Sequence, residues 1–493
     1  MQAFEMLKRC AAERGSNIAL VRGSVIVTWS ALALRVRRLA HGLRNHGVSP
    51  GERIAILVPP SAELVVIAYA ALAVGAVPVF LDPGLGLRRM LVLLEKCGAQ
   101  VLVGTPLAQV AVLGRSPPGL RLRICTKSWP GCSSLAALAG NDAALPEAAV
   151  NSDDPGIVLF TSGATGAAKA ISISRGTLDA QATCLALLAE IETDSVLLTV
   201  LPAMLLLGPA FGCTVRIPRR WRLLADLADS THSFGSPAVW EPVITEIERR
   251  RKRLPGLRRL LFGGCAIEPQ LIRRWKTAVP QARFASVYGS TEAVPLAWAW
   301  DDALLNQSGV GTLIGRAGPG AELSVTALPN CPALTTLRAR GPVVAGADWI
   351  DLGDVVRQDE SGDWWFLGRA SECITIAPGE VWTTAMIEPN FSHDGLRRIA
   401  AVGIGEAPHQ AVVLVLEPRR WPWTRAARAA LISTTLKQAP QLAAQLSLSP
   451  NRVLVRRRLP VDVRHRAKIL RGELAAWAAD RLNGTTDLNG TTE

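Results

Sequence analysis

The sequence predicts an α/β protein: a large N-terminal α/β domain of layered subdomains that includes a small β unit, plus a small α+β C-terminal domain. Short apolar, β-branched runs alternate with helix-like segments over roughly the first 300 residues, which is typical of parallel sheets covered by helices. Between Ala321 and Phe366, short strands and turns replace this alternation. After Arg369 the composition changes again and ends in Ala/Arg-rich amphipathic segments.

The clearest βαβ unit begins at an apolar strand, Ile54–Val58. A buried helix over Ala62–Val74, with Ser61 as its N-cap, and a short strand over Val77–Leu81 follow it. Two strands joined in this way pair in parallel with a right-handed crossover. The helix and the second strand are together about as long as a membrane span, which needs about 20 apolar residues. Because a charge, a glycine and a proline interrupt them (Glu63, Gly75 and Pro78), we expect a globular core and no transmembrane segment.

Further strand-like runs predict the remaining layers. In the large domain they are Val101–Gly104, Ile157–Phe160, Val196–Val200, Leu260–Phe262 and Phe284–Val287. In the mostly antiparallel β unit they are Glu322–Ala327, Thr335–Ala339, Val355–Gln358 and Trp364–Leu367. Two helices, Arg425–Lys437 and Gly472–Leu482, end the C-terminal domain. We therefore expect domains over residues 1–369 and 370–482 and a disordered polar tail over residues 483–493.

Composition excludes several classes of protein. With 493 residues, 49% apolar and 19% charged composition and a mean hydropathy of +0.23, the chain can bury large cores and is not disordered. Its formal charge of +13 attracts anions such as nucleotides, pyrophosphate and acyl carboxylates. Few aromatic residues interleave with the basic clusters Arg249–Arg253 and Arg456–Arg458. We interpret these clusters as solvated faces and expect no nucleic-acid partner.

The cysteines and histidines indicate neither a disulfide framework nor a structural metal. Nine cysteines are scattered without a CxxC pair, and six histidines show no HExxH spacing. The N-terminal segment carries acidic residues early and lacks a long apolar core, so it is not a signal peptide. These features predict a cytoplasmic protein with reduced thiols.

The first segment with chemical content is LFTSGATGAAK, from Leu159 to Lys169. A buried strand leads into small and hydroxyl-bearing residues that end at a lysine. Such loops turn backbone N–H groups toward phosphate oxygens, while hydroxyls donate hydrogen bonds and lysine adds a positive charge. The lysine spacing does not fit a Walker A loop. Taken alone, the segment leaves a phosphate site and an ordinary turn equally open.

Two further segments fit parts of a nucleotide. In YGSTE, Tyr288 can stack on a base, Thr291 can bond a phosphate and Glu292 can hold Mg²⁺ through oxygen. In DLGD, the strand-end Asp354 can accept both ribose hydroxyls, and Arg369 can reach the nucleotide or order the domain junction. Taken alone, YGSTE can equally be the end of a hairpin with an exposed Glu. Taken alone, DLGD with Arg369 can equally be a hairpin with a surface ion pair.

A fourth segment, LPVDVRHRAKI, places Lys468 between basic neighbours and the apolar Ile469. A single lysine in such a setting is more often part of a solvated basic loop than a catalytic group.

In their order, the four segments resemble the adenylate-forming (AMP-binding) superfamily of acyl- and aryl-CoA ligases, luciferases and peptide-synthetase adenylation domains. TSGATGAAKA is similar to the family's TSG[ST]TGxPKG, and YGSTE matches its YGxTE in full. Where the family has TGD, this chain has LGD. Gly368–Ile374 corresponds to the family's GRxxDxI, and Pro460–Arg471 corresponds to its lysine segment PxxxxGKIxR. The resemblance covers about residues 15–480 and implies an enzyme that uses ATP and Mg²⁺ to convert a carboxylate into an acyl-adenylate.

The resemblance also implies roles for individual residues. Thr161, Ser162, Gly163, Thr165, Gly166 and Lys169 bind the β- and γ-phosphates. Tyr288 frames the adenine together with Gly264, Cys265 and Ala266, and the neighbouring Gly289 and Ser290 also bind the nucleotide. Thr291 bonds the α-phosphate, Glu292 holds Mg²⁺, Asp354 binds the ribose, and Arg369 contacts the nucleotide. Lys468 bridges carboxylate and phosphate oxygens, and a mobile C-terminal domain delivers it by rotating between the half-reactions.

Within the superfamily, the chain is similar to the β-lactone synthetases of bacterial long-chain olefin biosynthesis. The similar stretches are GAVPVFLDPG, FGSPAVW, YGSTEAVPLA and PVDVRHRAKI. This likeness implies closure of an activated β-hydroxy fatty acid to a β-lactone, and it makes other enzymes of an olefin or lactone pathway possible partners. Arg464 and His465 are candidates for steering or deprotonating the hydroxyl, although His465 as a mere packing residue is an equal alternative. The expected aliphatic pocket consists of Leu207, Phe211, Phe234, Gly235, Ser236 and Trp240.

Some positions depart from the family pattern. Ala164 lacks a hydroxyl, Ala168 replaces a Pro, Ser371 stands where many relatives have a hinge Asp or Lys, and Leu205–Leu207 replaces an aromatic residue or His. Two other interpretations stay open. One is a fatty acyl-CoA ligase or acyl-loading AMP ligase, which shares the adenylation step. The other is a non-catalytic homologue, against which the presence of Glu292 and Lys468 argues.

Overall fold

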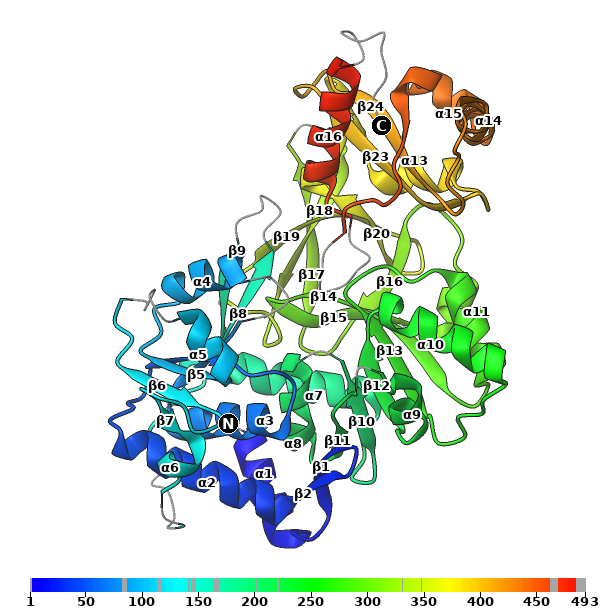
Figure 1. Ribbon diagram of the computed structural model, residues 1–493. Helices are drawn as coiled ribbons and strands as arrows, with labels where there is room; N and C mark the ends of the chain where they lie inside the picture. The colour runs from blue at the N-terminus through cyan, green and yellow to red at the C-terminus, as the bar shows by residue number, and fades with distance from the viewer. Residues whose placement is uncertain are drawn as a thin grey trace. The chain divides into compact units, whose positions relative to one another are not determined.

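The computed structural model describes residues 2–81, 87–112, 118–140, 142, 148–162, 168–200, 202–219, 221–329, 331–346, 348–461 and 469–484. Contacts within the chain divide it into two units (Figure 1). The first unit holds Met1–Leu305, Ala317–Glu322 and Arg340–Asp348, and the second holds Asn306–Arg316, Leu323–Ala339 and Trp349–Glu493. The predicted boundary between residues 369 and 370 stays a prediction. Residues 485–493 of the predicted tail lie outside the described residues.

One sheet of the first unit contains the predicted βαβ unit. Its order is β7-β6-β5-β3-β4-β8-β9, and its neighbours are parallel except β8 and β9. The strands are β3 (Arg53–Leu57), β4 (Val77–Phe80), β5 (Val101–Gly104), β6 (Leu122–Cys125), β7 (Ser133–Ser134), β8 (Pro155–Ser162) and β9 (Ala168–Ser174).

The predicted buried helix is α3 (Ala62–Ala73), which joins β3 to β4. The Ser61 side chain accepts a hydrogen bond from Leu64 N at 3.2 Å, as expected of an N-cap. Ten of the twelve residues in α3 are buried, so the apolar stretch is a core helix. None of the described helices combines the length and apolar content that a membrane crossing requires.

The other first-unit strands form part of a second sheet in the order β15-β14-β13-β12-β10-β11-β1-β2. From β1 to β14 the neighbours are parallel, whereas the β1–β2 and β14–β15 pairs are antiparallel. The strands are β1 (Ile18–Arg22), β2 (Val25–Thr28), β10 (Val196–Thr199), β11 (Thr214–Arg216), β12 (His232–Gly235), β13 (Arg259–Gly263), β14 (Arg283–Ser290) and β15 (Ala293–Trp300).

Helices cover the two sheets of the first unit (Figure 1). Among them α7 contacts both β8 and β15 and so links the sheets. The helices are α1 (Gln2–Glu13), α2 (Trp29–Asn45), α4 (Leu87–Lys96), α5 (Pro106–Val112), α6 (Leu135–Leu138), α7 (Arg175–Ala189), η2 (Pro202–Leu206), α8 (Leu207–Phe211), α9 (Leu223–Ala228), α10 (Pro237–Arg250), α11 (Pro269–Ala278) and α12 (Asp301–Leu305).

The second unit begins with antiparallel strands, as predicted for the small β unit. The pairs β18–β19, β19–β20 and β16–β20 are all antiparallel. The strands are β16 (Thr312–Ala317), β17 (Glu322–Leu328), β18 (Cys331–Arg340), β19 (Ile350–Gln358) and β20 (Trp364–Arg369).

The rest of the second unit is an α+β structure around the sheet β23-β24-β25. Alternate residues of β23 and β24 enter two separate cores, one with α13, α14 and α15 and the other with α16, which is the period of two expected of a sheet covered on both faces. The elements are η3 (Ala370–Glu372), β21 (Ile374–Ala377), β22 (Glu380–Trp382), α13 (Thr384–Phe391), β23 (Leu396–Ile404), β24 (Ala411–Pro418), α14 (Arg425–Leu436), α15 (Pro440–Gln445), η4 (Pro450–Arg452), β25 (Val453–Val455) and α16 (Arg471–Gly484).

Candidate active site

Three segments singled out from the sequence meet at one edge of the second sheet. Gly235 pairs with Phe262, and Gly263 pairs with Val287, so β12, β13 and β14 end side by side. The segments Phe234–Ser236, Gly264–Ala266 and Tyr288–Ser290 therefore lie at neighbouring strand ends. Ligands of open α/β sheets bind outside the carboxyl ends of parallel strands, which makes this edge the candidate site of the first unit.

The YGSTE segment is a tight hairpin in the structure, which is the alternative that the sequence left open. Ser290 ends β14 and pairs with Ala293 of β15, so Thr291 and Glu292 form the turn. Gly289 is required here, because a Cβ at that position would lie 2.5 Å from the Ala293 carbonyl oxygen. The Glu292 carbonyl accepts a hydrogen bond from Ala345 N at 2.7 Å. Among the described residues, none forms an ion pair with the half-exposed Glu292 carboxylate.

Buried polar atoms without partners lie at the same edge. Ser236 occupies the N-cap position of α10, but its side chain makes no capping hydrogen bond. Within the described part of the chain, Ser236 Oγ, Ser290 Oγ and the indole nitrogen of Trp240 are buried without a hydrogen-bond partner. Leaving such an atom unpaired costs about 1–3 kcal/mol. The edge is therefore suited to a ligand or water that supplies the missing partners.

Half of the six predicted acyl-pocket residues belong to one apolar cluster. Leu207, Phe211 and Phe234 pack there. Trp240 lies elsewhere, against Gly235, where a Cβ would come within 2.6 Å of the indole nitrogen. Trp298 and Trp300 of β15 join the cluster and were missed from the sequence. Their alternation in LAWAW, with every second side chain on the same face of a strand, was the available signal.

The predicted phosphate segment is a hairpin of β8 and β9. Thr161 lies opposite Lys169, and Ser162 lies opposite Ala168, so the lysine belongs to a strand rather than to the end of a loop. The side chains of Thr161, Ser162 and Lys169, and all of Gly163, Thr165 and Gly166, lie outside the described residues.

Asp354 and Arg369 are direct cross-strand neighbours in the second unit. They face each other on β19 and β20, and Arg369 Nε lies 2.9 Å from Asp354 Oδ1. Arg369 Nη1 also donates to the Leu352 carbonyl at 2.8 Å. The hairpin ion pair that the sequence left open is therefore formed, and it is only partly buried, because 35% of the Arg369 side chain is exposed. Close by in sequence, burial and the nearby Glu372 raise the pKa of the Cys373 thiol to about 11, so this thiol stays protonated at neutral pH.

Arg464, His465 and Lys468 lie outside the described residues, but the base of their segment is well defined. Val461 and Ile469 form a β-bridge, and Leu470 N donates to the Pro460 carbonyl at 2.9 Å. On one side, Leu459 N donates to Oε2 of the buried Glu417 at 3.0 Å.

On the other side of this segment, Arg471 forms a partly buried clamp of ion pairs. Its Nη1 and Nη2 lie 2.5 and 3.1 Å from the two carboxylate oxygens of Glu388. Its Nε lies 3.1 Å from Glu372 Oε2, and Nη1 donates to the Ala401 carbonyl at 3.0 Å. Residues of the η3 turn, α13 and β23 therefore hold the start of α16 and, with it, the end of the lysine segment. Glu372 and Arg471 lie inside two of the sequence motifs but had no role assigned to them, and Glu388 lies outside the motifs.

Comparisons with known proteins identify the family and the fold. The family model "AMP-binding enzyme" matches residues 7–328. The olefin beta-lactone synthetases of Stenotrophomonas maltophilia and Xanthomonas campestris are 29% and 30% identical to this chain, over 96% of it and over 95% and 94% of their own lengths.

Solved structures share the fold. The anthranilate CoA ligase AuaEII in complex with anthranoyl-AMP superposes with a TM-score of 0.82 at 17% identity and covers 98% of both chains. The amide bond synthetase McbA of Marinactinospora thermotolerans gives a TM-score of 0.80 at 20% identity, over 96% of this chain and 99% of its own. With the family model matching well over half of its residues, this chain belongs to the AMP-binding superfamily of adenylate-forming ligases.

Proposed function

We propose that the protein activates a β-hydroxy fatty acid as an acyl-adenylate and then closes it to a β-lactone, with release of pyrophosphate and AMP. The observation that carries this proposal is the near-full-length similarity to two olefin beta-lactone synthetases, at 29% and 30% identity. The apolar cluster around Phe211, Phe234 and Trp298 is consistent with an aliphatic substrate.

In the first half-reaction, a carboxylate oxygen attacks the α-phosphorus of ATP and pyrophosphate leaves. The proposed phosphate ligands are Thr161, Ser162, Gly163, Thr165, Gly166 and Lys169. Tyr288 would frame the adenine together with Gly264, Cys265 and Ala266, and the neighbouring Gly289 and Ser290 would also bind the nucleotide. Asp354 would accept the ribose hydroxyls, and Arg369 would hold Asp354 in place. Thr291 would bond the α-phosphate, and Lys468 would bridge carboxylate and phosphate oxygens as charge moves between them. The work is positioning and charge neutralisation rather than covalent chemistry on the protein.

Glu292 is the proposed magnesium ligand. Mg²⁺ in nucleotide sites is commonly held by one or two carboxylates together with substrate phosphates. The described residues hold no cluster of three His, Cys, Asp or Glu side chains that could bind a metal by themselves, whereas Glu292 offers a half-exposed carboxylate on a fixed turn. When bound, Mg²⁺ would neutralise phosphate charge.

In the second half-reaction, the β-hydroxyl oxygen attacks the adenylate carbonyl, the hydroxyl proton goes to a base, and AMP leaves. We propose His465 as that base, with Arg464 steering the hydroxyl, since a histidine can accept a proton near neutral pH. The anhydride supplies the driving force for the strained four-membered ring, and enforced proximity replaces an external thiol. Enzymes that make the acid or consume the lactone are the expected partners.

Product analysis by mass spectrometry tests the proposal. The purified protein is incubated with ATP, Mg²⁺ and a 2-alkyl-3-hydroxy fatty acid, with and without CoA. We expect a β-lactone and AMP without CoA. The matched substrate that lacks the 3-hydroxyl should give acyl-adenylate and no lactone. A thioester formed only with CoA would establish the acyl-CoA ligase instead, and no turnover of ATP with either acid would establish a non-catalytic homologue.

A further inference from the structure

In one long stretch of the second unit, every charged residue is basic. Residues 418–461 contain no Asp or Glu, although 41 of the 493 residues in the chain are acidic. Glu417 precedes the stretch and Asp462 follows it. Its basic residues are Arg419, Arg420, Arg425, Arg428, Lys437, Arg452, Arg456, Arg457 and Arg458. This part of the surface therefore has a positive charge that no acid within the stretch offsets.

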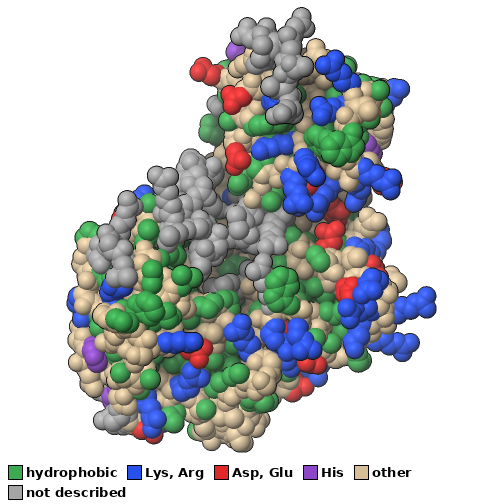
Figure 2. Space-filling model, in the orientation of Figure 1, with side chains coloured by type: hydrophobic (Ala, Val, Ile, Leu, Met, Phe, Trp, Pro, Cys, Tyr) green, Lys and Arg blue, Asp and Glu red, His purple; other side chains and the backbone are tan. Residues whose placement is uncertain are grey.

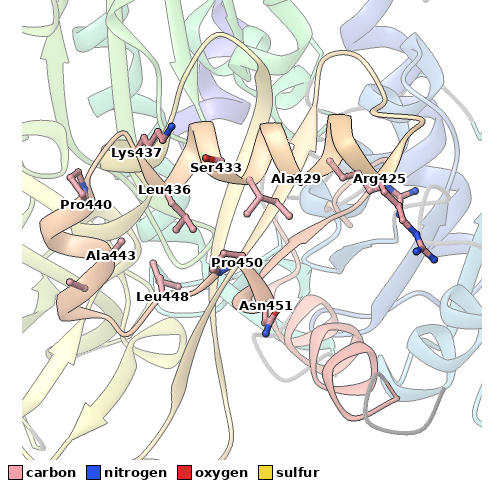
Figure 3. A pocket seen from close by; sticks show the side chains of 13 residues that line it. Arg425, Ala429, Ser433, Leu436, Lys437, Pro440, Ala443, Leu448, Pro450 and Asn451 are labelled. Atoms are coloured by element: carbon pink, nitrogen blue, oxygen red, sulfur yellow. The ribbon is translucent and has the colours of Figure 1, made fainter. Parts of the chain in front are cut away.

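The same stretch folds around an apolar groove. The helices α14 and α15 and the turn η4 line an open groove with a volume of about 730 Å³ (Figure 3). Figure 3 shows Leu436 of α14 and Leu448 pointing toward each other across the groove. Ile432 and Ala443 complete the apolar floor. The floor carries no charge.

Charged side chains form the rim. Arg425 and Arg428 lie toward the start of α14, and Lys437 follows its end. The guanidinium of Arg428 lies 5.3 Å from the ring centre of Trp421, so stacking holds this cation in place. Trp423, just before α14, is 79% exposed. A cationic rim, an apolar floor and an exposed tryptophan are features that protein-binding surfaces share.

We propose that this groove binds an acidic amphipathic helix of a partner protein. A helix can place its apolar ridge between Leu436 and Leu448 while carboxylates on its flanks meet Arg425, Arg428 and Lys437. A membrane surface fits less well, because lipid binding requires apolar side chains that protrude rather than line a hollow. Single-stranded nucleic acid requires aromatic stacking surfaces along a basic track, and this floor is aliphatic.

Binding of a designed probe tests the proposal on the full-length protein. The probe is a fluorescein-labelled 18-residue helical peptide with leucines on one face and glutamates on the other, followed by fluorescence anisotropy. We expect saturable binding that weakens with salt. We expect a peptide of the same composition in scrambled order to bind at least about tenfold more weakly, because it has no continuous apolar ridge.

Two groove variants locate the site. Arg425→Glu/Arg428→Glu reverses the rim charge, and Ala429→Trp fills the groove from an exposed helical position. Each should weaken probe binding by about tenfold or more. The control Lys252→Glu/Arg253→Glu makes the same charge change at an exposed basic site of the first unit and should leave binding unchanged. Circular dichroism confirms that each variant is folded.

Three results would overturn the proposal. Equal binding of the scrambled peptide would mean general charge attraction. Unchanged binding by Ala429→Trp would place the peptide outside the groove. Tight binding of phosphatidylglycerol vesicles, lost in both groove variants while the probe does not compete, would make the groove a lipid site.

Discussion

At the scale of single residues, Glu292 is the best isolated functional candidate that the structure describes, because no described cation pairs with its carboxylate. Glu292→Gln keeps the shape and removes the charge. Even indirect supports of metal ligands are worth 10–100-fold in affinity, so the Mg²⁺ concentration for half-maximal pyrophosphate exchange should rise by at least about tenfold. The control is Glu322→Gln, which removes an exposed acid paired with Arg340. An unchanged Mg²⁺ requirement would leave Glu292 only structural.

His232 makes the first unit sensitive to acid. It is buried on β12, and Thr231 Oγ1 lies 2.8 Å from its Nδ1. Burial, with the nearby Arg259 and Arg258, lowers the pKa of His232 from 6.5 to about 4. Because the unfolded chain binds the proton more tightly, stability present above pH 6.5 is lost as the pH falls toward 4. The loss should be about 3 kcal/mol, since one pKa unit corresponds to about 1.4 kcal/mol.

The measurement for His232 is the urea midpoint of first-unit unfolding at pH 7 and at pH 4.5. His232→Gln should flatten the difference between the two values, whereas His409→Gln, at an exposed position, should leave it as in the parent. Equal acid sensitivity in the parent and in His232→Gln would contradict the assignment.

The sequence identified individual chemical groups better than their pairings. Asp354 and Arg369 were singled out by short motifs, with a hairpin ion pair left open as an alternative, and the structure shows that they do pair across β19 and β20. Glu388 and Arg471 are 83 residues apart and form a two-point contact. Nothing in the local sequence around either one indicates the other, because such contacts depend on how β23 and α16 pack.

At the scale of elements, apolar runs predicted the central strands β3, β4, β5, β8, β10, β13 and β14, but the prediction left out other apolar strands such as β15, β23 and β24. It failed for β12, which reads His-Ser-Phe-Gly, because this buried strand carries polar residues that find hydrogen-bond partners in neighbouring segments. Ser233 Oγ, for instance, donates to the Leu198 carbonyl at 2.8 Å. It also failed for β9, whose lysine and serines suggested a loop although they alternate with Ile171 and Ile173.

The clamp at the start of α16 should set the rate of adenylation rather than nucleotide affinity. Arg471→Lys keeps the charge but loses the two-point contact with Glu388, because an ammonium cannot bind both oxygens as a guanidinium does. We expect kcat for ATP–pyrophosphate exchange to fall by about 10–100-fold while KM for ATP changes little.

Arg471→Gln should be slower still, and Arg471→Gln/Glu388→Gln should restore stability, but not rate, by removing the uncompensated carboxylate. A rise in KM for ATP at unchanged kcat would show that the clamp does not act through the lysine segment.

The apolar cluster that includes residues of α8, β12 and β15 should determine how substrate affinity depends on acyl-chain length. Each buried CH₂ contributes roughly 0.8 kcal/mol, so the affinity for 3-hydroxy acids should rise about fourfold per added carbon until the site is full. Trp298→Ala should shift the optimum to longer chains. Trp221→Ala removes a tryptophan that is 86% exposed and serves as the control. Higher activity on acetate than on any fatty acid would refute an aliphatic site.

At the scale of the whole molecule, the proposed chemistry draws on both units, because Glu292 belongs to the first and Lys468 to the second. Lys468→Ala should lower the rate of pyrophosphate exchange by about 10²–10³-fold, the usual effect of removing a transition-state charge contact. Binding of ATP and of the fatty acid should change little. Lys437→Ala, an exposed lysine of the same unit, should exchange at the parental rate. A Lys468→Ala rate close to the parent would remove this lysine from the mechanism.

The composition gave the net charge of the whole chain, but it did not show where on the surface the charged residues lie. Figure 2 shows more Lys and Arg than Asp and Glu on the visible face, in keeping with the formal charge of +13. The cluster at Arg249 and Arg250 is partly neutralised by Glu246 within one helical turn. Residues 418–461 contain no acidic residue that could neutralise their basic residues in this way. The sequence shows this only when one looks for the absence of Asp and Glu.

The burial of α3 has a consequence for biosynthesis. Its apolar surface packs against Leu205, Val215 and Ile217, and the Tyr69 hydroxyl donates to the Leu206 carbonyl at 2.7 Å. These covering residues follow the end of α3 by more than 130 positions in the chain. At a synthesis rate of about 5–20 residues per second, the helix waits roughly 7–30 s for them. The earlier helix α2 already packs against α3, so throughout that interval the nascent chain exposes the face of α3 that these later residues cover. Holding chaperones should engage that face on the ribosome.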